Sequence, residues 1–308
     1  MAQAIQFIKA LADDTRLRLL YVLNRYELNV NELIAVMGMG QSRVSRHLKI
    51  LASAGLLSWR RDGLWVFYSA VPNGTGRKFI EAVLPFVADE AEFQADLNAA
   101  AGVIEERLRV TRQFFNAIAD DWDQLARDVL GSFDLPGAIT DLVPEGSVAV
   151  DLGCGTGEVI ERMLDVADEV IGVDGSARML DLARRRFTDN AERVSLRIGD
   201  LEHLPLRDAE VDFISVNMVL HHLSSPVAAL REAGRVLRPG GSIVIADFDR
   251  HEDEAMRVNY GDRWLGFTEE ALRSALRDAG FAPLSARKVA VEKGLFIHLI
   301  QAEYTAAL

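Results

Sequence analysis

The feature that most constrains the fold of this chain is a glycine-rich segment at residues 148–159, which reads VAVDLGCGTGEV. An apolar run typical of a buried strand leads into Gly153, Gly155 and Gly157. Glycines at a strand-to-helix turn permit tight turning and let the main chain approach a ligand closely. The spacing, G-x-G-x-G preceded by Asp151, differs from the G-x-G-x-x-G of dinucleotide-binding enzymes. The turn therefore favours a bound ligand and argues against NAD.

Short apolar strands alternate with amphipathic helices from Gly146 onward, which predicts an α/β fold with a parallel, doubly wound sheet. The expected strands are 148–152, 170–173, 194–198, 211–216 and 242–248. Asp174 closes the second strand, 23 residues after Asp151, where a carboxylate can accept both hydroxyls of a ribose. Asp200 closes the third strand, where it suits a bond to an adenine amino group. We expect these carboxylates to converge, beside the glycine turn, on one nucleoside.

The first quarter of the chain follows a different pattern, in which helices lead into a hairpin. Helical spacing predicts a helix at about residues 30–37 and another at 41–53, with Ser42 as the expected cap. Two β-rich runs within residues 57–68 flank the dipeptide Asp62-Gly63, which is typical of tight hairpins. The order of helix, helix, tight turn, helix and hairpin predicts a winged helix-turn-helix domain.

Charge is distributed unevenly along the chain. Residues 1–75 carry a formal charge of +4 and the remainder −16, within a net charge of −12. The segment 41–61 holds five basic residues and no acidic one. A basic head on an acidic body is typical of a nucleic-acid-binding module joined to a non-binding one, although charge alone also fits an uneven surface without a partner.

The expected DNA contacts lie on the polar side of the 41–53 helix and on the hairpin. In a helix-turn-helix, the second helix enters the major groove with its first residues facing base edges. Gln and Arg suit bidentate contacts with adenine and guanine, whereas Ser and Lys serve phosphates. The residues expected to contact double-stranded DNA are Gln41, Ser42, Arg43, Ser45, Arg46 and Lys49, with Arg60 and Arg61 at the tip of the wing.

About seventy residues at the N-terminus closely resemble ArsR-type repressors. The resemblance rests on ALADDTRLRLLYVL, on QSRVSRHLKILASAGL and on RRDGLWVFY. Metal-sensing members of that family carry two cysteines in the third-helix segment, where this chain has Asn29 and Asn31. Amide side chains are poor ligands for soft metals, so we expect no metal sensing through that site.

Residues from about Phe114 to Tyr304 resemble class I methyltransferases, through the glycine turn, VNMVLHHL and LREAGRVLRPGGSIVIADF. The resemblance implies a Rossmann-like domain with a mixed seven-stranded sheet that binds S-adenosylmethionine or S-adenosylhomocysteine. The resemblance implies that the glycines lie against the methionine moiety, that Asp174 binds the ribose, and that Asp200 and Leu201 contact the adenine. The residues implied to hold the adenosyl ligand are Asp151, Gly153, Gly155, Gly157, Asp174, Gly175, Met179, Asp200, Leu201 and Asn217, with Phe115 and Trp122 on a lid helix.

Three other residues, Cys154, His221 and His222, could have either a structural or a catalytic role. Cys154 lies inside the glycine turn and is the only cysteine, which excludes an intrachain disulfide and a multi-thiolate metal site. We expect a small buried side chain there rather than a reactive thiol. His221 and His222 could serve as a base, but wall or capping roles are favoured. The sequence therefore predicts no catalytic residue and no metal ligand.

The two resemblances together imply an ArsR–methyltransferase fusion, in which residues 1–75 bind DNA, 76–112 connect and dimerise, and 113–308 bind the adenosyl ligand. Some such fusions are SahR-type regulators of methionine-cycle genes, which use the methyltransferase fold as a sensor. The leading hypothesis is a homodimeric, cytoplasmic repressor that binds a palindromic operator and responds to S-adenosylhomocysteine or S-adenosylmethionine, with no membrane association. The alternative is an active methyltransferase tethered to a DNA-binding domain, and no acceptor-specific group distinguishes it.

Overall fold

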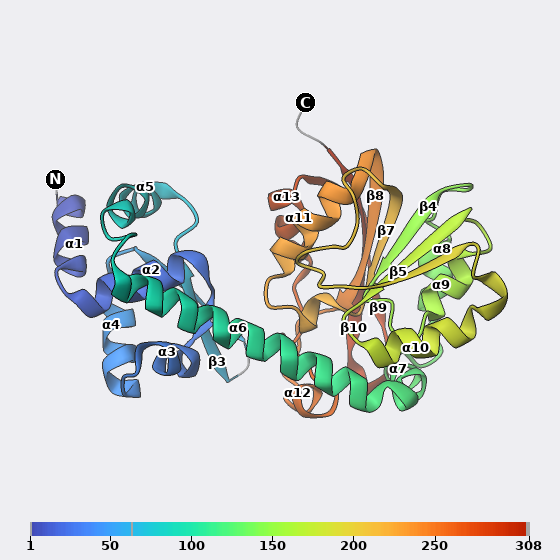
Figure 1. The fold of residues 1–308 in the computed structure, drawn as a ribbon, viewed down its shortest axis with the longest axis horizontal. Helices are drawn as coiled ribbons and strands as arrows, with labels where there is room; N and C mark the ends of the chain where they lie inside the picture. The colour runs from blue at the N-terminus through green and yellow to red at the C-terminus, as the bar shows by residue number, and fades with distance from the viewer. Residues whose placement is uncertain (1, 63, 306–308) are drawn as a thin grey trace. The chain divides into compact units, whose positions relative to one another are not determined.

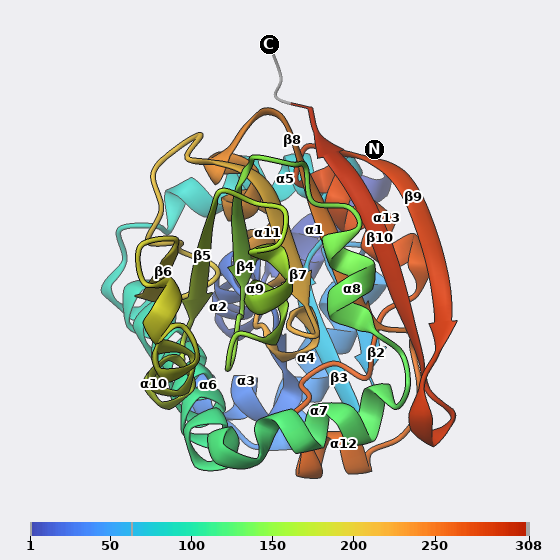
Figure 2. The ribbon, with the colours of Figure 1, turned by 90° about the vertical axis from the view of Figure 1, so that its right-hand side faces the viewer.

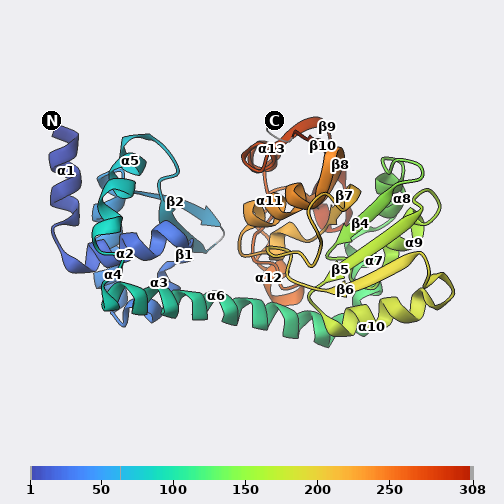
Figure 3. The same cartoon turned by 45° about the horizontal axis from the view of Figure 1, so that its top comes forward.

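The structure is a computed structural model, and it describes residues 2–62 and 64–305. Gly63 of the predicted Asp62-Gly63 turn, Met1 and residues 306–308 lie outside the described part. The chain divides into two compact units, Met1–Leu108 and Arg109–Leu308 (Figure 1). Helix α6 (Ala91–Ile118) begins in the first unit and ends in the second, and Figure 3 shows it as one uninterrupted helix.

The first unit is a winged helix-turn-helix. Its elements are α1 (Ala2–Leu11), α2 (Asp14–Arg25), β1 (Leu28–Asn29), α3 (Val30–Met37), α4 (Gln41–Ser53), β2 (Leu57–Asp62), β3 (Trp65–Ala70), α5 (Gly74–Val83), the 3₁₀ turn η1 (Leu84–Phe86) and the first part of α6. The strands form a small antiparallel sheet in the order β1-β3-β2. The bounds of α3 and α4 agree with the sequence prediction.

The turn between α3 and α4 depends on glycine. Gly38 caps the C-terminal end of α3, and its φ of 60° lies in the left-handed region that favours glycine. The predicted capping role of Ser42 is wrong, because Gly40 is the N-cap of α4 and Ser42 already lies inside the helix. Asn29 caps α3, since its side chain accepts from the Glu32 amide while the Glu32 carboxylate accepts from the Asn29 amide. Asn29 is one of the two asparagines at the positions where metal-sensing ArsR-type proteins carry cysteines, and here it has a structural role as a helix cap.

The first part of α6 is held on the helix-turn-helix core by ion pairs. Arg18 of α2 binds the buried Asp96 of α6 with two hydrogen bonds, of 2.6 and 2.7 Å. Arg107 of α6 donates to the Glu32 carboxylate, which also takes part in the capping of α3. Bidentate arginine–carboxylate pairs fix orientation as well as adding energy. The first part of α6 is therefore packed against the first unit as one of its structural elements.

The second unit is a three-layer α/β domain. Its strands are β4 (Val148–Leu152), β5 (Glu169–Asp174), β6 (Val194–Ile198), β7 (Val211–Asn217), β8 (Leu237–Phe248), β9 (Phe281–Ala290) and β10 (Phe296–Tyr304). Its helices are α7 (Trp122–Leu130), α8 (Leu135–Thr140), α9 (Glu158–Met163), α10 (Ala177–Arg186), α11 (Pro226–Val236), α12 (Ala255–Asn259) and α13 (Glu269–Asp278). Four 3₁₀ turns complete it: η2 (Ala119–Asp121), η3 (Thr188–Asn190), η4 (Leu220–His222) and η5 (Glu292–Gly294).

The seven strands form one mixed sheet in the order β6-β5-β4-β7-β8-β10-β9, with β6 and β9 at its two edges (Figure 2). The first five are parallel, whereas β10 pairs antiparallel with both β8 and β9. The resemblance to methyltransferases implied this mixed sheet, and it is confirmed. The five strands expected from strand–helix alternation are the parallel ones, and that alternation did not predict the antiparallel hairpin of β9 and β10.

Helices cover both faces of the sheet, as alternation of side chains along the strands requires. Val150 and Leu152 of β4 belong to one apolar cluster, together with residues of α11 and α13. Ala149 of the same strand belongs to the other cluster, with residues of α8, α9 and α10. Because the five central strands are parallel, their carboxyl ends lie along one edge, where ligands bind in open α/β sheets.

Across residues 2–62 and 64–305, no helix combines the length and the apolar character needed to cross a membrane.

Candidate functional site

The glycine turn follows β4 directly and adopts backbone angles that other residues avoid. Gly153, Gly155 and Gly157 have φ values of 77°, 52° and 90°. A Cβ on Gly153 would lie 2.3 Å from the Val219 side chain, and one on Gly157 would lie 2.5 Å from Phe187. Two of the three positions thus require glycine both for conformation and for space. Gly155 is the more open one, with Trp122 as its nearest neighbour at 3.4 Å.

Asp174 ties the turn to the neighbouring strand. Its Oδ2 accepts the Gly155 amide at 2.9 Å, and its Oδ1 accepts the Ser176 amide at 2.7 Å. Each carboxylate oxygen has two lone pairs, so a pair of ribose hydroxyls can still donate to Asp174. Burial raises the pKa of Asp174, and these amides oppose the rise. The carboxylate is therefore fixed in place at the carboxyl edge of the sheet.

Asp151 has a different environment from the one expected of a ligand contact. It is 2% exposed, and its Oδ1 accepts the hydroxyl of Ser215 from the adjacent strand β7. Burial, reinforced by the nearby Asp174, raises the pKa of Asp151 to about 7. This hydrogen bond joins β4 to the adjacent strand β7.

The adenine-side residues predicted from the sequence lie after β6. Asp200 is half-buried, and its Oδ1 accepts the Glu202 amide at 2.9 Å. Leu201 beside it is 7% exposed. Gly175 lies close to this segment, because a Cβ there would be 3.6 Å from the Gly199 carbonyl oxygen. The ends of β5 and β6 therefore adjoin, as a shared nucleoside site would require.

Two further predicted residues lie along the same edge of the sheet. Met179 of α10 is buried, and its amide is capped by the Ser176 hydroxyl at 3.1 Å. Asn217 ends β7, and its side-chain oxygen is buried with no hydrogen-bond partner among residues 2–62 and 64–305. A buried acceptor of this kind costs free energy unless something donates to it. The amine or hydroxyl of a bound ligand would supply that donor.

The predicted lid aromatics pack together above the turn. The Phe115 ring lies 5.5 Å from Trp122 and 4.8 Å from His222, centroid to centroid, in edge-to-face contacts. Trp122 in turn approaches Gly155. Both aromatic residues are half-buried. They therefore lie where a lid over the glycine turn is expected.

Two acidic residues of the lid segment, Asp120 and Asp123, anchor it to neighbouring elements. Asp120 binds Arg178 through hydrogen bonds of 2.6 and 2.9 Å. Asp123 accepts the hydroxyl of the buried Thr156 and binds Arg186 at 2.7 Å. The pattern Ala-Asp-Asp-Trp-Asp alone could not show these pairs, because the basic partners come from α10.

Asn116 is a site residue that sequence reasoning missed. Its side-chain oxygen accepts the Ser176 hydroxyl at 2.7 Å and the Arg178 amide at 3.2 Å. It thereby links the end of α6 to the start of α10, next to Asp174. An asparagine in a long helical segment carries no sequence signal for such a contact.

The histidine pair lies in η4, directly after β7. His221 is buried, and its Nδ1 lies 2.7 Å from a carboxylate oxygen of Asp247. Burial opposes its charge, but Asp247 and Asp262 raise the pKa of His221. Burial and the neighbouring His221 lower the pKa of His222 well below its ordinary range. The two imidazoles therefore have different protonation preferences. 

Cys154 is buried, and burial raises the pKa of its thiol well above the ordinary range. A thiol in this state is a weak nucleophile.

The residues of α4 that we expect to contact DNA are exposed to solvent. The helix buries Val44, Leu48 and Leu51 against the core of the first unit. Six residues on its other side are exposed, namely Gln41, Ser42, Arg43, Ser45, Arg46 and Lys49. In the wing, Arg61 is exposed, whereas Arg60 binds Glu27 through hydrogen bonds of 2.7 and 3.0 Å and lies over the Phe67 ring. Arg60 would have to leave this pair to reach DNA.

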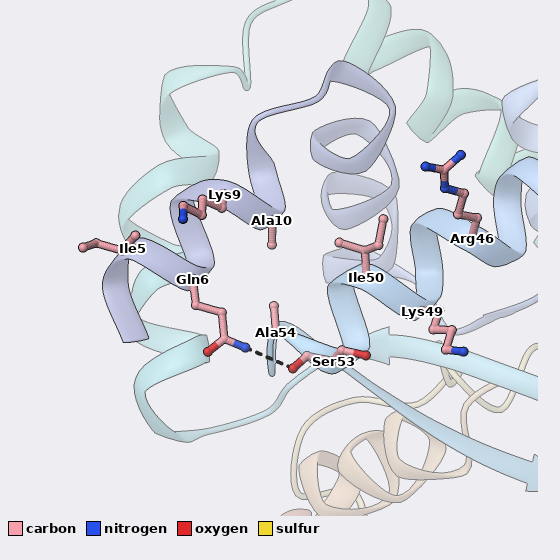
Figure 4. A pocket seen from close by; sticks show the side chains of 9 residues that line it. All are labelled: Ile5, Gln6, Lys9, Ala10, Arg46, Lys49, Ile50, Ser53 and Ala54. Atoms are coloured by element: carbon pink, nitrogen blue, oxygen red, sulfur yellow. Dashed lines mark hydrogen bonds between the residues drawn. The ribbon is translucent and has the colours of Figure 1, made fainter. Parts of the chain in front are cut away.

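An open groove of about 600 Å³ lies between α1 and α4 (Figure 4). Gln6 of α1 donates a hydrogen bond across it to the Ser53 carbonyl oxygen, at 3.2 Å. Arg46 and Lys49 of α4 are among the residues that line this groove. Both basic side chains are exposed to solvent.

Two family descriptions match the two units. "Bacterial regulatory protein, arsR family" matches residues 13–58, and "Methyltransferase domain" matches residues 150–245. The first match covers the helix-turn-helix, and the second covers β4 through most of β8.

Similar curated proteins match parts of the chain. An uncharacterized 37.1 kDa protein in transposon TN4556 of Streptomyces fradiae is 39% identical over 120 residues, which is 38% of this chain and 34% of that protein. Demethylmenaquinone methyltransferases of Staphylococcus saprophyticus and Lactiplantibacillus plantarum are 37% and 41% identical over 105 and 100 residues. Those matches cover 33% and 31% of this chain, and 45% and 42% of the enzymes. The chain spans between a third and a half of the length of these relatives.

Similar solved structures share the fold of the second unit. The [4+2]-cyclase SpnF superimposes with a TM-score of 0.55 at 19% identity, covering 64% of this chain and 95% of that protein. A SAM-dependent methyltransferase from Aquifex aeolicus gives a TM-score of 0.51 at 22% identity, covering 62% and 98%. The two family matches show that the chain joins an ArsR-family helix-turn-helix domain to a methyltransferase domain, and the solved structures show that the second unit has the class I methyltransferase fold.

Proposed function

We propose that this chain is a DNA-binding transcription regulator, a repressor, whose methyltransferase domain binds S-adenosylhomocysteine or S-adenosylmethionine as its effector. The proposal rests above all on Asp174, which is fixed at the carboxyl edge of the sheet by the Gly155 and Ser176 amides. The buried side-chain oxygen of Asn217, which has no partner in the part of the chain that the structure describes, supports a polar ligand at the same edge. The residues proposed to hold the ligand are those predicted from the sequence.

The route from ligand to DNA in this proposal runs through α6. The helix carries Arg107, which binds Glu32 of α3, and eight residues later Phe115 of the lid. A ligand that favours one arrangement of the lid would bias the helix, and through it the helix-turn-helix. We propose that a homodimer presents two α4 helices to the halves of a palindromic operator, as helix-turn-helix dimers do.

Two binding measurements test the proposal. Calorimetry on the full chain should show binding of S-adenosylhomocysteine, and a gel shift with operator DNA should change when the ligand is added. Failure of both adenosyl compounds to bind would overturn the effector role. Binding without any change in DNA affinity would overturn the regulatory coupling but not the site.

The second candidate function is methyl transfer by a tethered enzyme, and the His221–Asp247 pair favours it. A buried imidazole held at 2.7 Å by a carboxylate is a suitable general base for an acceptor that must lose a proton. Methyl transfer otherwise needs mainly in-line positioning. Transfer of labelled methyl from S-adenosylmethionine to a cell extract, lost in His221→Ala but kept in His203→Gln, would establish the enzyme.

A further inference from the structure

His221, His222 and Asp262 bring three potential metal ligands together in the second unit. One nitrogen of each histidine and one oxygen of Asp262 all lie within 4.8 Å of one another. The histidines are in η4, and Asp262 lies in the segment between α12 and α13. None of the three belongs to the expected adenosyl contacts, and the sequence predicts no metal ligand.

Both imidazoles are oriented through their Nδ1 atoms. His221 Nδ1 lies 2.7 Å from Asp247 Oδ1, and His222 Nδ1 donates to the Gly261 carbonyl oxygen at 3.1 Å. Asp247 is itself fixed, because it accepts the amides of Phe248 and His221. Metal-binding histidines commonly donate one ring nitrogen to a carboxylate or carbonyl, which leaves the other as the ligand. The pair has that arrangement, with both Nε2 atoms left to bind a cation.

The environment of Asp262 is the observation that most favours a bound cation. It is 4% exposed, and neither of its carboxylate oxygens has a hydrogen-bond partner in the described part of the chain. The His221 ring lies close to it, with Nε2 3.6 Å from Asp262 Oδ1. A buried carboxylate without a partner is costly, and a bound ion or a proton must offset that cost.

The surrounding chain encloses this cluster. The amides of Arg263 and Trp264 both donate to the His221 carbonyl oxygen at 2.9 Å, which holds the 261–264 segment against η4. Phe115 packs on His222, and a Cβ on Gly261 would lie 2.8 Å from the Phe114 ring. The three ligands are thus supported by backbone and by packing, as a metal site requires.

We propose that His221, His222 and Asp262 bind a first-row divalent transition-metal ion. Two imidazole nitrogens and one carboxylate oxygen suit Zn²⁺, Fe²⁺ or Co²⁺, and they leave coordination positions for water or an oxygen donor of a small molecule. Ligand atoms around tetrahedral Zn²⁺ lie about 3.3–3.5 Å apart, given bonds of roughly 2.0–2.2 Å. The 3.6 Å separation of His221 Nε2 and Asp262 Oδ1 is close to that spacing.

The site adjoins the proposed ligand-binding edge without being part of it. It begins four residues after Asn217, and its histidine contacts the lid residue Phe115. A metal here would place a Lewis acid beside the adenosyl site, under the same lid. This inference goes beyond the proposed regulator function, and its test needs neither DNA nor an adenosyl ligand.

Cobalt titration of the tag-free, chelator-treated full chain tests the proposal. We expect one Co²⁺ per chain, with visible d–d absorption typical of nitrogen and oxygen ligands, and displacement by Zn²⁺. Asp262→Asn and His222→Gln should abolish the absorption. Asp247→Asn should weaken binding by about 10- to 100-fold, because it removes the orienting partner of His221.

The matched control is His203→Gln, which removes an exposed histidine outside the cluster and should leave the absorption unchanged. If the wild-type chain develops no cobalt absorption, or Asp262→Asn develops the same absorption, the proposal fails. In that case His221 holds a proton between Asp247 and Asp262 instead. If Asp262→Asn does not fold, His222→Gln and the effect of Zn²⁺ on the wild-type Tm decide the question: a rise supports the site and an unchanged Tm overturns it.

Discussion

Asp174 is the single residue on which the proposed adenosyl site depends most. It accepts two backbone amides, and its charge is what ribose hydroxyls would recognise. Asp174→Asn should weaken S-adenosylhomocysteine binding by about 10- to 100-fold, because hydrogen bonds to a charged group contribute about 1.5–3 kcal/mol. Calorimetry measures the change. Asp181→Asn, on the exposed side of α10, is the control and should bind as wild type.

Asp151 makes a pH-dependent contribution to folding that can be isolated. Burial raises its pKa from 3.8 to about 7, so the folded state binds this proton more tightly than the unfolded state does. The stability it contributes is complete below about pH 4 and is lost as the pH rises through 7. Wild type should therefore lose free energy of unfolding relative to Asp151→Asn across this window, by up to about 1.4 kcal/mol per pH unit. Denaturant unfolding of the ligand-free protein at several pH values measures this; parallel profiles would contradict it.

The sequence predicts residues at this scale only where a local pattern marks them. Asp174 and Asp200 follow apolar runs, and the glycines follow one another at fixed spacing, so each could be placed before any coordinates. Asp262 and Asn116 lie in segments without periodicity, and their roles arise from contacts with distant elements. Arg60 was predicted to contact DNA from its place in the wing, but its pairing with Glu27 needs a partner 33 residues away.

At the scale of elements, α4 is predicted to be the DNA-reading helix, and salt dependence tests it. Lys49 is exposed, and its side chain suits a phosphate contact. Lys49→Ala should weaken binding to all sequences about equally. It should also reduce the slope of log K against log salt by about 0.9, the value for one phosphate contact. Lys78→Ala, an exposed lysine of α5, should leave the slope unchanged. An unchanged slope in Lys49→Ala would remove this residue from the interface.

The lid segment η2–α7 should control how long the ligand stays bound. Asp123 ties it to Thr156 in the glycine turn and to Arg186 of α10. Asp123→Ala should speed S-adenosylhomocysteine dissociation about two- to fivefold, since partly exposed ion pairs contribute roughly 0.5–1 kcal/mol. Stopped-flow displacement measures the rate. Asp128→Ala, on the exposed side of α7, is the matched control. Equal rates in the two variants would mean that the Asp123 contacts do not hold the lid.

Helices and strands were predicted correctly where the apolar periodicity of the sequence was strong. The prediction failed where strand pairing determined the structure. The bounds of α3, α4, β4 and β6 agree with those expected from apolar spacing. The hairpin of β9 and β10 was not placed from its own residues. Most residues of β9 are half-buried or exposed, so the strand lacks a clear apolar face. Its pairing with β10 creates the antiparallel edge that strand–helix alternation cannot show.

For the whole molecule, the charge difference between the two parts of the chain has a functional consequence. Residues 1–75 carry +4, whereas the remainder carries −16 and should be repelled by DNA phosphates. Association should therefore depend on the basic residues of the helix-turn-helix alone and weaken steeply with salt. In the proposed regulator the acidic remainder should also limit non-specific binding, so that specificity and the ligand response would both act through α4 and the wing.

Regulation by an adenosyl ligand predicts a coupling between ligand binding and DNA binding that a function of one domain alone would not produce. If ligand binding changes the affinity for operator DNA by some factor, operator DNA must change the affinity for the ligand by the same factor, because coupling free energy is reciprocal. Such factors are typically about 5- to 150-fold. Titrating S-adenosylhomocysteine into the protein alone and into its operator complex measures one side, and DNA titration at zero and saturating ligand measures the other. Arg107→Ala, which removes the α6 contact with Glu32, should reduce both factors equally while each ligand still binds. Two unequal factors would mean that the ligand acts outside this equilibrium, and two factors of one would leave the methyltransferase domain as a tethered enzyme.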